Sequence, residues 1–132
     1  MKSITAKVNK CLEVGSYLRC ADNTGATMIK VIAVKGFKGV KRRRARCGVG
    51  SWIICSVKKG TPKLRKEVVN AVVVRQKKEY RRKNGMRIKF EDNAVVLVNE
   101  KGDPRGSRIK GPIAKEVVER FSTIGKIASM VM

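Results

Sequence analysis

A run of basic residues in the first half of the chain has the composition of a segment that binds polyanions. Between residues 35 and 46 there is no acidic residue, and Gly36 and Gly39 alternate with cations: Lys35, Lys38, Lys41, Arg42, Arg43, Arg44 and Arg46. Glycine lets a backbone come close to a phosphate, and the arginine guanidinium binds two phosphate oxygens at once. The segment therefore indicates contact with RNA or DNA phosphates, although a solvated basic loop or a nuclear localisation signal has the same composition.

Three further basic clusters favour the nucleic-acid interpretation. The second cluster surrounds Tyr80 and consists of Arg75, Lys77, Lys78, Arg81, Arg82 and Lys83. The third lies on both sides of Gly60-Thr61-Pro62 and consists of Lys58, Lys59, Lys63, Arg65 and Lys66. The fourth consists of Arg105, Arg108 and Lys110. We expect all four clusters in loops, where they would bind phosphates of several RNA helices and so fix position without reading base sequence.

Aromatic residues are too few for a surface that reads single-stranded RNA by stacking several bases, since they make up 5% of the chain. Tyr80 could stack on a base or sugar, but we expect it to pack on the rim of the fold, and we expect Trp52 to be buried. Gly36-Phe37-Lys38-Gly39 has the spacing of the GXXG loop of KH domains, but that loop joins two helices and here it follows a β-branched run. Recognition of RNA shape and backbone is therefore the preferred hypothesis.

The residue types that most enzymes need are scarce. The chain has no histidine, so the commonest general base and zinc ligand are missing. Asp22 and Asp92 could hold a divalent ion for RNA cleavage if the fold brought them together, but Asp22-Asn23-Thr24-Gly25 is typical of a turn. No zinc-binding spacing exists among the four cysteines, for which we expect reduced thiols with a packing role: Cys11, Cys20, Cys47 and Cys55. We predict no catalytic residue, no metal site, no cofactor and no small-molecule substrate.

The overall composition indicates a folded basic domain. The chain has 132 residues, with 32 Lys and Arg against 10 Asp and Glu, and its formal charge of +22 implies strong self-repulsion unless a polyanion neutralises it. A hydrophobic fraction of 42% is too high for a disordered basic tail, and the length suits a single domain. No apolar run is long enough to cross a membrane, and we expect a cytosolic protein without a membrane partner.

Short β-branched runs between turn residues predict a mainly β body over residues 1–100, as a small antiparallel barrel or sandwich. The predicted strands cover residues 17–20, 28–35, 52–57, 68–74, 86–90 and 94–98. Residues 71–74 do not alternate apolar with polar side chains, which predicts a strand that is covered on both faces. Asn84-Gly85 predicts a type I′ turn in a basic hairpin over residues 75–90.

Residues 101–132 have a different pattern, which predicts loops and a short helix. After Gly111-Pro112, the residues Ile113, Val117 and Phe121 recur every four positions, as in an amphipathic helix that ends before Ser122. These three side chains form a candidate protein-docking face. Packing against the end of the barrel is the alternative, and in a small domain it is the better expectation.

Several of these segments resemble the family of large-subunit ribosomal protein L-fourteen. From Ala71 to Leu97 the chain has the spacing of the family signature: three β-branched residues, a mostly basic stretch, Asn84-Gly85, Phe90 and Asn93. The resemblance covers nearly the whole chain and includes residues 20–26, 57–60, 73–76, 90–94, 104–106 and 111–112. Residues 91–93 and the last six residues are similar to the archaeal and eukaryotic members. The chain departs from the usual family residues at Thr27, Ser51 and Asn84.

The resemblance implies a five-stranded β-barrel with a C-terminal segment of loops and short helices. It also implies a structural constituent of the large ribosomal subunit that binds large-subunit rRNA and joins an intersubunit bridge to small-subunit rRNA. Further implied partners are ribosomal proteins L-three and L-twenty-four-e, and an anti-association initiation factor at the C-terminal region. On the residues alone, a free single-stranded RNA-binding barrel of the cold-shock or OB type stays an alternative, as does a metal-dependent RNA-processing enzyme.

Overall fold

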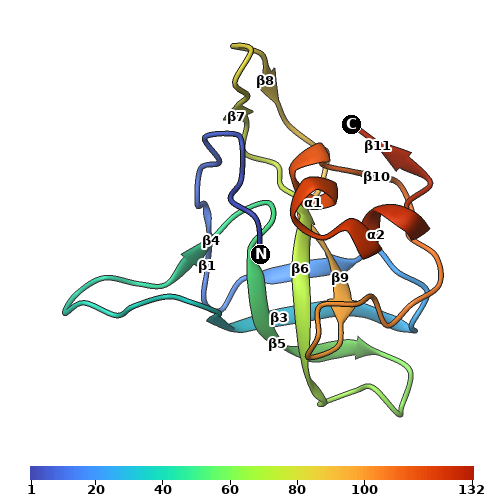
Figure 1. Cartoon of the computed structure of the whole chain (residues 1–132). Coiled ribbons are helices and arrows are strands. Elements are labelled where there is room, and N and C mark those ends of the chain that lie inside the picture. Colours follow the sequence, from blue (N-terminus) through green and yellow to red (C-terminus); the bar gives the residue numbers. More distant parts are fainter.

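A closed barrel of five strands forms the body of the molecule in the computed structural model, which describes residues 1–132 (Figure 1). In barrel order the strands are β2 (Tyr17–Cys20), β3 (Ala26–Val34), β5 (Trp52–Gly60), β6 (Val68–Arg75) and β9 (Ala94–Val98). Neighbouring strands are antiparallel except β2 and β9, which close the barrel as a parallel pair. The expected five-stranded barrel is confirmed, with one parallel pair where a fully antiparallel arrangement was predicted.

Shorter elements lie outside the barrel. Two antiparallel pairs are formed by β1 (Leu12–Glu13) with β4 (Arg46–Cys47) and by β7 (Tyr80–Arg81) with β8 (Arg87–Ile88). The C-terminal part contains α1 (Lys115–Arg120), α2 (Ser122–Ile127) and the parallel pair of β10 (Pro112–Ile113) and β11 (Met130–Val131). Neither helix has the length and hydropathy of a bilayer span. The predicted helix corresponds to α1, whereas α2 was not predicted.

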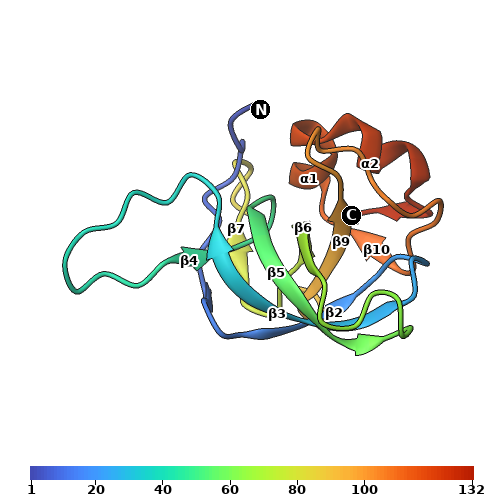
Figure 2. The ribbon, with the colours of Figure 1, turned by 90° about the horizontal axis from the view of Figure 1, so that it is seen from below.

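Strand β6 is buried on both faces because different parts of the chain cover them. Ala71 and Val73 lie in the core inside the barrel. The alternate residues Val72 and Val74 lie in a second core outside the barrel, together with side chains of the C-terminal segment. Figure 2 shows the two helices on this side of the barrel. The burial of residues 71–74 on both faces is therefore confirmed, and the C-terminal segment supplies the outer cover.

The hairpin of β7 and β8 has a longer turn than predicted. The backbone N–H of Arg82 donates to the carbonyl of Met86 at 2.8 Å, and the N–H of Gly85 donates to the carbonyl of Arg82 at 2.9 Å. Gly85 has a φ of 88°, whereas Asn84 is not in the positive-φ region. The connection is therefore a three-residue loop with a left-handed glycine, and the type I′ prediction was wrong. The Asn84 side chain stabilises this loop by accepting the N–H of Met86 at 3.0 Å.

A long arm, residues 35–45, connects β3 with β4 and projects from one side of the barrel. In Figure 2 the arm and the C-terminal helices extend on opposite sides of the molecule. The short pairing of β4 with β1 holds the end of the arm against the N-terminal segment. The fold therefore displays the first basic cluster away from the core.

Candidate nucleic-acid interface

The arm presents most of its cations to solvent without acidic partners. All side chains of residues 35–44 are exposed. Ion pairs with an acid are formed by Arg44 and Arg46, both with Glu13, at N–O distances of 3.3 and 3.0 Å. Because one carboxylate faces two guanidinium groups and the other cations are unpaired, the arm keeps a strong positive charge that a polyanion would neutralise.

The second cluster contains four exposed cations and two that bind the protein itself. The exposed ones are Lys77, Lys78, Arg81 and Lys83. Of these, Lys78 forms a surface ion pair with Glu79 at 3.1 Å. The two exceptions, Arg75 and Arg82, are largely covered, so the cluster is smaller than the sequence predicted.

Arg75 lies at the end of β6, not in a loop, and its guanidinium is enclosed by protein acceptors. It donates to the two carboxylate oxygens of Asp92 at 2.8 and 3.1 Å and to the carbonyls of Lys110 and Pro112 at 2.8 and 2.9 Å. A Cβ at Gly111 would lie 2.7 Å from this guanidinium, so the chain passes very close to it. The predicted rRNA-binding role of Arg75 therefore does not fit the structure, in which Arg75 anchors the C-terminal segment to the barrel.

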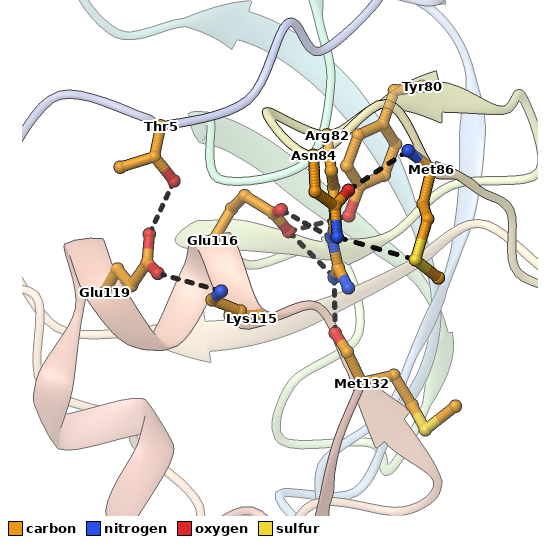
Figure 3. A network of polar contacts seen from close by, with 9 residues as sticks. All are labelled: Thr5, Tyr80, Arg82, Asn84, Met86, Lys115, Glu116, Glu119 and Met132. Atoms are coloured by element: carbon orange, nitrogen blue, oxygen red, sulfur yellow. Dashed lines mark hydrogen bonds and ion pairs between the residues drawn. The ribbon is translucent and has the colours of Figure 1, made fainter.

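Arg82 belongs to a buried network with Tyr80 and Glu116 (Figure 3). Its Nε donates to one oxygen of Glu116 at 2.8 Å, and the Tyr80 hydroxyl donates to the other at 2.7 Å. Arg82 also donates to the carbonyl of Met132, which brings the C-terminal end to the hairpin. Tyr80 is fully buried, so the prediction that it packs on the rim is confirmed and base stacking by Tyr80 does not fit.

Burial would raise the pKa of Glu116, but hydrogen bonds from Arg82 and Tyr80 outweigh this effect and hold the pKa below its usual value. Conversely, burial and the hydrogen bond to Glu116 raise the pKa of the Tyr80 hydroxyl. Glu116 is thus a carboxylate and Tyr80 a neutral donor at neutral pH. The network is a charged clamp between the hairpin and α1.

The third and fourth clusters lie next to each other, which the sequence did not reveal. Lys58 and Lys59 are exposed on the end of β5, because this strand extends beyond its predicted boundary to Gly60. The other members of these clusters that we predicted as site residues are also exposed: Lys63, Arg65, Arg105 and Arg108. An ion pair at 3.4 Å joins Arg105 to Glu67, which follows the third cluster.

The turn at residues 22–25 connects these two clusters. The Asn23 side-chain oxygen accepts the N–H groups of Ser107 and Arg108 at 3.0 and 3.3 Å. On the other side of the turn, the N–H of Thr61 donates to the carbonyl of Gly25 at 3.2 Å. The two clusters therefore form one basic surface around this turn.

The carboxylates of the enzyme alternative have separate structural partners. Asp22 accepts the N–H and hydroxyl of Thr24 at 3.3 and 2.6 Å with one oxygen, and the N–H of Leu97 at 2.9 Å with the other. The predicted turn at Asp22 is therefore confirmed, while Asp92 is bound to Arg75. No group of three or more His, Cys, Asp and Glu side chains is placed to hold a metal ion.

The four cysteines are free thiols, as expected from the sequence. Burial raises the pKa of both Cys47 and Cys55 to about 12, with a smaller contribution from Cys11 at Cys47. Both side chains lie in the core inside the barrel. These two thiols are therefore unreactive packing residues at neutral pH.

The predicted docking residues lie in the core. Ile113 and Val117 are fully buried, and Phe121 is 7% exposed with its ring centroid 6.0 Å from that of Trp52. The structure thus favours the core alternative for these three residues. The exposed apolar side chains of the C-terminal part are instead Met130, Val131 and Met132.

Two residues at the arm, Phe37 within it and Lys10 beside it, were not predicted as site residues. Lys10 and Phe37 line one hollow with the arm cations. Lys10 is an isolated lysine, and Phe37 has the same sequence signal as any apolar residue of a loop. Only the return of the chain through β1 and β4 brings them together.

Comparison with known proteins gives full-length relatives. Residues 11–132 match the protein family described as Ribosomal protein L14p/L23e. The chain is 51% identical to the large ribosomal subunit protein uL14 of Methanocorpusculum labreanum and 52% identical to that of Haloarcula marismortui. It is 50% identical to the uL14 protein of Methanothrix thermoacetophila. Each of these alignments covers 100% of both chains.

Proposed function

This chain belongs to the Ribosomal protein L14p/L23e family, and on that premise we propose that it is a structural protein of the large ribosomal subunit that binds large-subunit rRNA. The observation that carries the proposal is the exposure of the basic side chains at the molecular surface. Apart from Arg75 and Arg82, every predicted rRNA-binding side chain is exposed. Phosphates are the ligands that such a dispersed set of lysines and arginines suits best.

The basic surfaces face different directions, which supports contacts with more than one rRNA segment. The arm, the β7–β8 hairpin and the region of the β5–β6 loop project from separate sides of the barrel in Figure 1. One phosphate backbone cannot easily reach all three. The protein therefore binds separate rRNA segments and holds them in a fixed arrangement.

The family resemblance extends the proposal to further partners. These are small-subunit rRNA at an intersubunit bridge, ribosomal proteins L-three and L-twenty-four-e, and an anti-association initiation factor. The C-terminal contact would use the exposed side chains of Met130, Val131 and Met132, because Ile113 and Val117 are buried. In this role the chain acts in the ribosomes of the cytoplasm.

The alternatives have less support. A free single-strand binder of the OB type uses several aromatics on one face, but here Trp52 and Tyr80 are buried, and the exposed Tyr17 and Phe37 lie on different segments. For an RNA-processing enzyme, Asp22 and Asp92 would need free carboxylate oxygens at one site, and they are bound to separate partners. We propose a non-catalytic role.

The salt dependence of rRNA binding tests this proposal. For the full chain and a large-subunit rRNA fragment, log affinity should fall against log salt with a slope of about 0.7 to 0.9 per phosphate contacted. The combined change of Arg42, Arg43 and Arg44 to Gln should lower that slope and weaken binding across RNA sequences alike. The matched control removes three exposed lysines outside the clusters: Lys101, Lys115 and Lys126.

The control variant should bind nearly as well as wild type, because it has the same net charge as the arm variant but an intact arm. A wild-type slope near zero would show that phosphates are not the ligand. Equal weakening in both variants would show that net charge matters and the arm does not.

A further inference from the structure

The arm and Lys10 of the N-terminal segment line an open hollow that combines cations with one aromatic ring. From this we propose that the hollow binds one unstacked nucleotide of RNA, with its base on Phe37 and its flanking phosphates on the surrounding cations. The proposal rests on the proposed function and goes beyond it, because stacking in a defined hollow is a different form of recognition from phosphate contact alone.

The hollow has a volume of about 700 Å³ and is lined by Lys10, Phe37, Lys41, Arg42, Arg43, Arg44 and Arg46. It contains no acidic lining residue. Phe37 is 37% exposed, so part of its ring is available to a ligand. A basic, open hollow with a single apolar ring matches the two parts of a nucleotide, whose base has a π-face and whose phosphates are anionic.

Local turns fix the backbone of the arm at Phe37 and at Arg42. The N–H of Phe37 donates to the carbonyl of Val34 at 3.3 Å, and Gly36 has a φ of 83°, as in a type II turn at the end of β3. The N–H of Arg43 donates in the same way to the carbonyl of Val40 at 3.0 Å, with Arg42 at a φ of 67°. Glycine adopts this φ without strain, whereas arginine does not. The chain therefore has a cation at this position of the hollow although its backbone conformation is strained.

The charges around the hollow exceed what the protein itself neutralises. Lys10, Lys41, Arg42 and Arg43 form no ion pair, while Arg44 and Arg46 share Glu13. A nucleotide in a chain has one phosphate on each side, and these cations lie around the hollow that would hold it. An RNA duplex would use the cations but leave Phe37 in water, so the ring favours an unstacked nucleotide.

A stacking contact and a phosphate contact respond differently to salt, which makes the proposal testable. The probes are a fluorescein-labelled oligoadenylate of twelve nucleotides, an RNA duplex of the same length and a large-subunit rRNA fragment, each titrated with the full chain at several salt concentrations. The Phe37→Leu variant should lower the affinity for the oligoadenylate by roughly 5- to 150-fold, the usual effect of losing one stacked base, with an unchanged salt slope. Its affinity for the duplex should stay at the wild-type value.

Two further variants serve as controls. The Phe37→Tyr variant keeps an aromatic ring and should bind the oligoadenylate like wild type. The Arg42→Gly variant keeps the turn but removes one cation, so it should lower the salt slope by about 0.7. Phe37 lies on the exposed arm, outside both cores, so its variants should keep the wild-type melting temperature.

Four results would overturn the inference. Wild-type affinity of Phe37→Leu for the oligoadenylate would mean that the hollow binds phosphates only. An equal loss with the duplex would make Phe37 a packing residue of the arm. A twelve-residue polyglutamate that binds as tightly and shows the same loss would assign the hollow to an acidic protein segment. Binding of the rRNA fragment without binding of the oligoadenylate would overturn this inference and leave the proposed function standing. Failure to bind the rRNA fragment would overturn the proposed function.

Discussion

At the residue scale, Arg75 and Arg82 show how burial beside an acid changes the role of an arginine. The side chain of Arg75 is 10% exposed and that of Arg82 is 18% exposed, and each is bound to a carboxylate. Removing one partner of such a pair leaves an uncompensated charge in a place that water reaches poorly. These two arginines therefore hold the fold together, while the exposed lysines and arginines stay available for phosphates.

The network around Glu116 predicts a specific acid sensitivity. A carboxylate with a lowered pKa in the folded state stabilises the fold above its unfolded pKa of about 4.5, and this contribution is lost as the pH falls through the folded value. Wild type should therefore lose more free energy of unfolding between pH 6 and pH 3 than the Glu116→Gln variant. Urea unfolding at a series of pH values measures this difference.

The control is Glu100→Gln, because Glu100 is exposed and forms no ion pair. It should keep the wild-type pH dependence. Parallel stability curves for wild type and Glu116→Gln would contradict an ionised, stabilising Glu116.

The basic clusters are recognisable in the sequence, but nothing there separates Arg75 and Arg82 from their exposed neighbours. The partners Asp92 and Glu116 are 17 and 34 positions further along the chain. Nothing in the local pattern marks these acids, since both contacts arise from the closure of the barrel and the return of the C-terminal segment. By contrast, the turn at Asp22 was predictable because the acceptor Asp22 and its donor Thr24 are only two residues apart in the sequence.

At the element scale, the C-terminal helices complete the core on the outside of the barrel. Ile124 of α2 is fully buried in the second core. A Cβ at Gly125 would lie 2.6 Å from Val118 of α1, so the two helices approach each other closely. We infer that the helical segment is an integral part of the fold and not an appendage.

This packing predicts a large effect of a single change in α2. The Ile124→Ala variant should lower the free energy of unfolding by about 2–5 kcal/mol, because it leaves a cavity between α2 and the barrel. Lys126→Ala on the same helix is the control, since Lys126 is exposed and should change stability by less than about 0.5 kcal/mol. Chemical unfolding followed by circular dichroism measures both values, and a small effect of Ile124→Ala would show that α2 only rests on the surface.

The elements that could be predicted are those with a strong local pattern. The predicted boundaries of β2 and β9 match the observed ones, because β9 is a continuous apolar run and β2 ends at the turn residues that follow Cys20. Helix α2 was missed because Ser122-Thr123-Ile124-Gly125 has low helix propensity, and its stability comes from tertiary packing. Of the two-residue strands, β8 lies within the strand predicted over residues 86–90, whereas the others were missed because so short a segment has no measurable periodicity.

At the scale of the whole molecule, the positive charge lies outside the core of the barrel, which consists of apolar side chains. Ten acidic residues face 32 basic ones, and two of the acids are used for the buried pairs of Arg75 and Arg82. Much of the remaining surplus lies on the arm, the hairpin and the surface formed by the third and fourth clusters. Such an arrangement is costly for a free protein, because like charges repel, and it becomes stable when phosphates lie between the cations.

The most direct test of the central claim is to follow the tagged full chain through a sucrose gradient of cell lysate, with a high-salt wash before centrifugation. We expect the chain in the fractions of the large subunit and of the complete ribosome, because it contacts several rRNA segments at once and the loss of one contact to salt does not release it. The arm variant with Arg42, Arg43 and Arg44 changed to Gln should be released at lower salt. A wild-type chain that stays at the top of the gradient, or that follows the small subunit alone, would contradict a structural role in the large subunit.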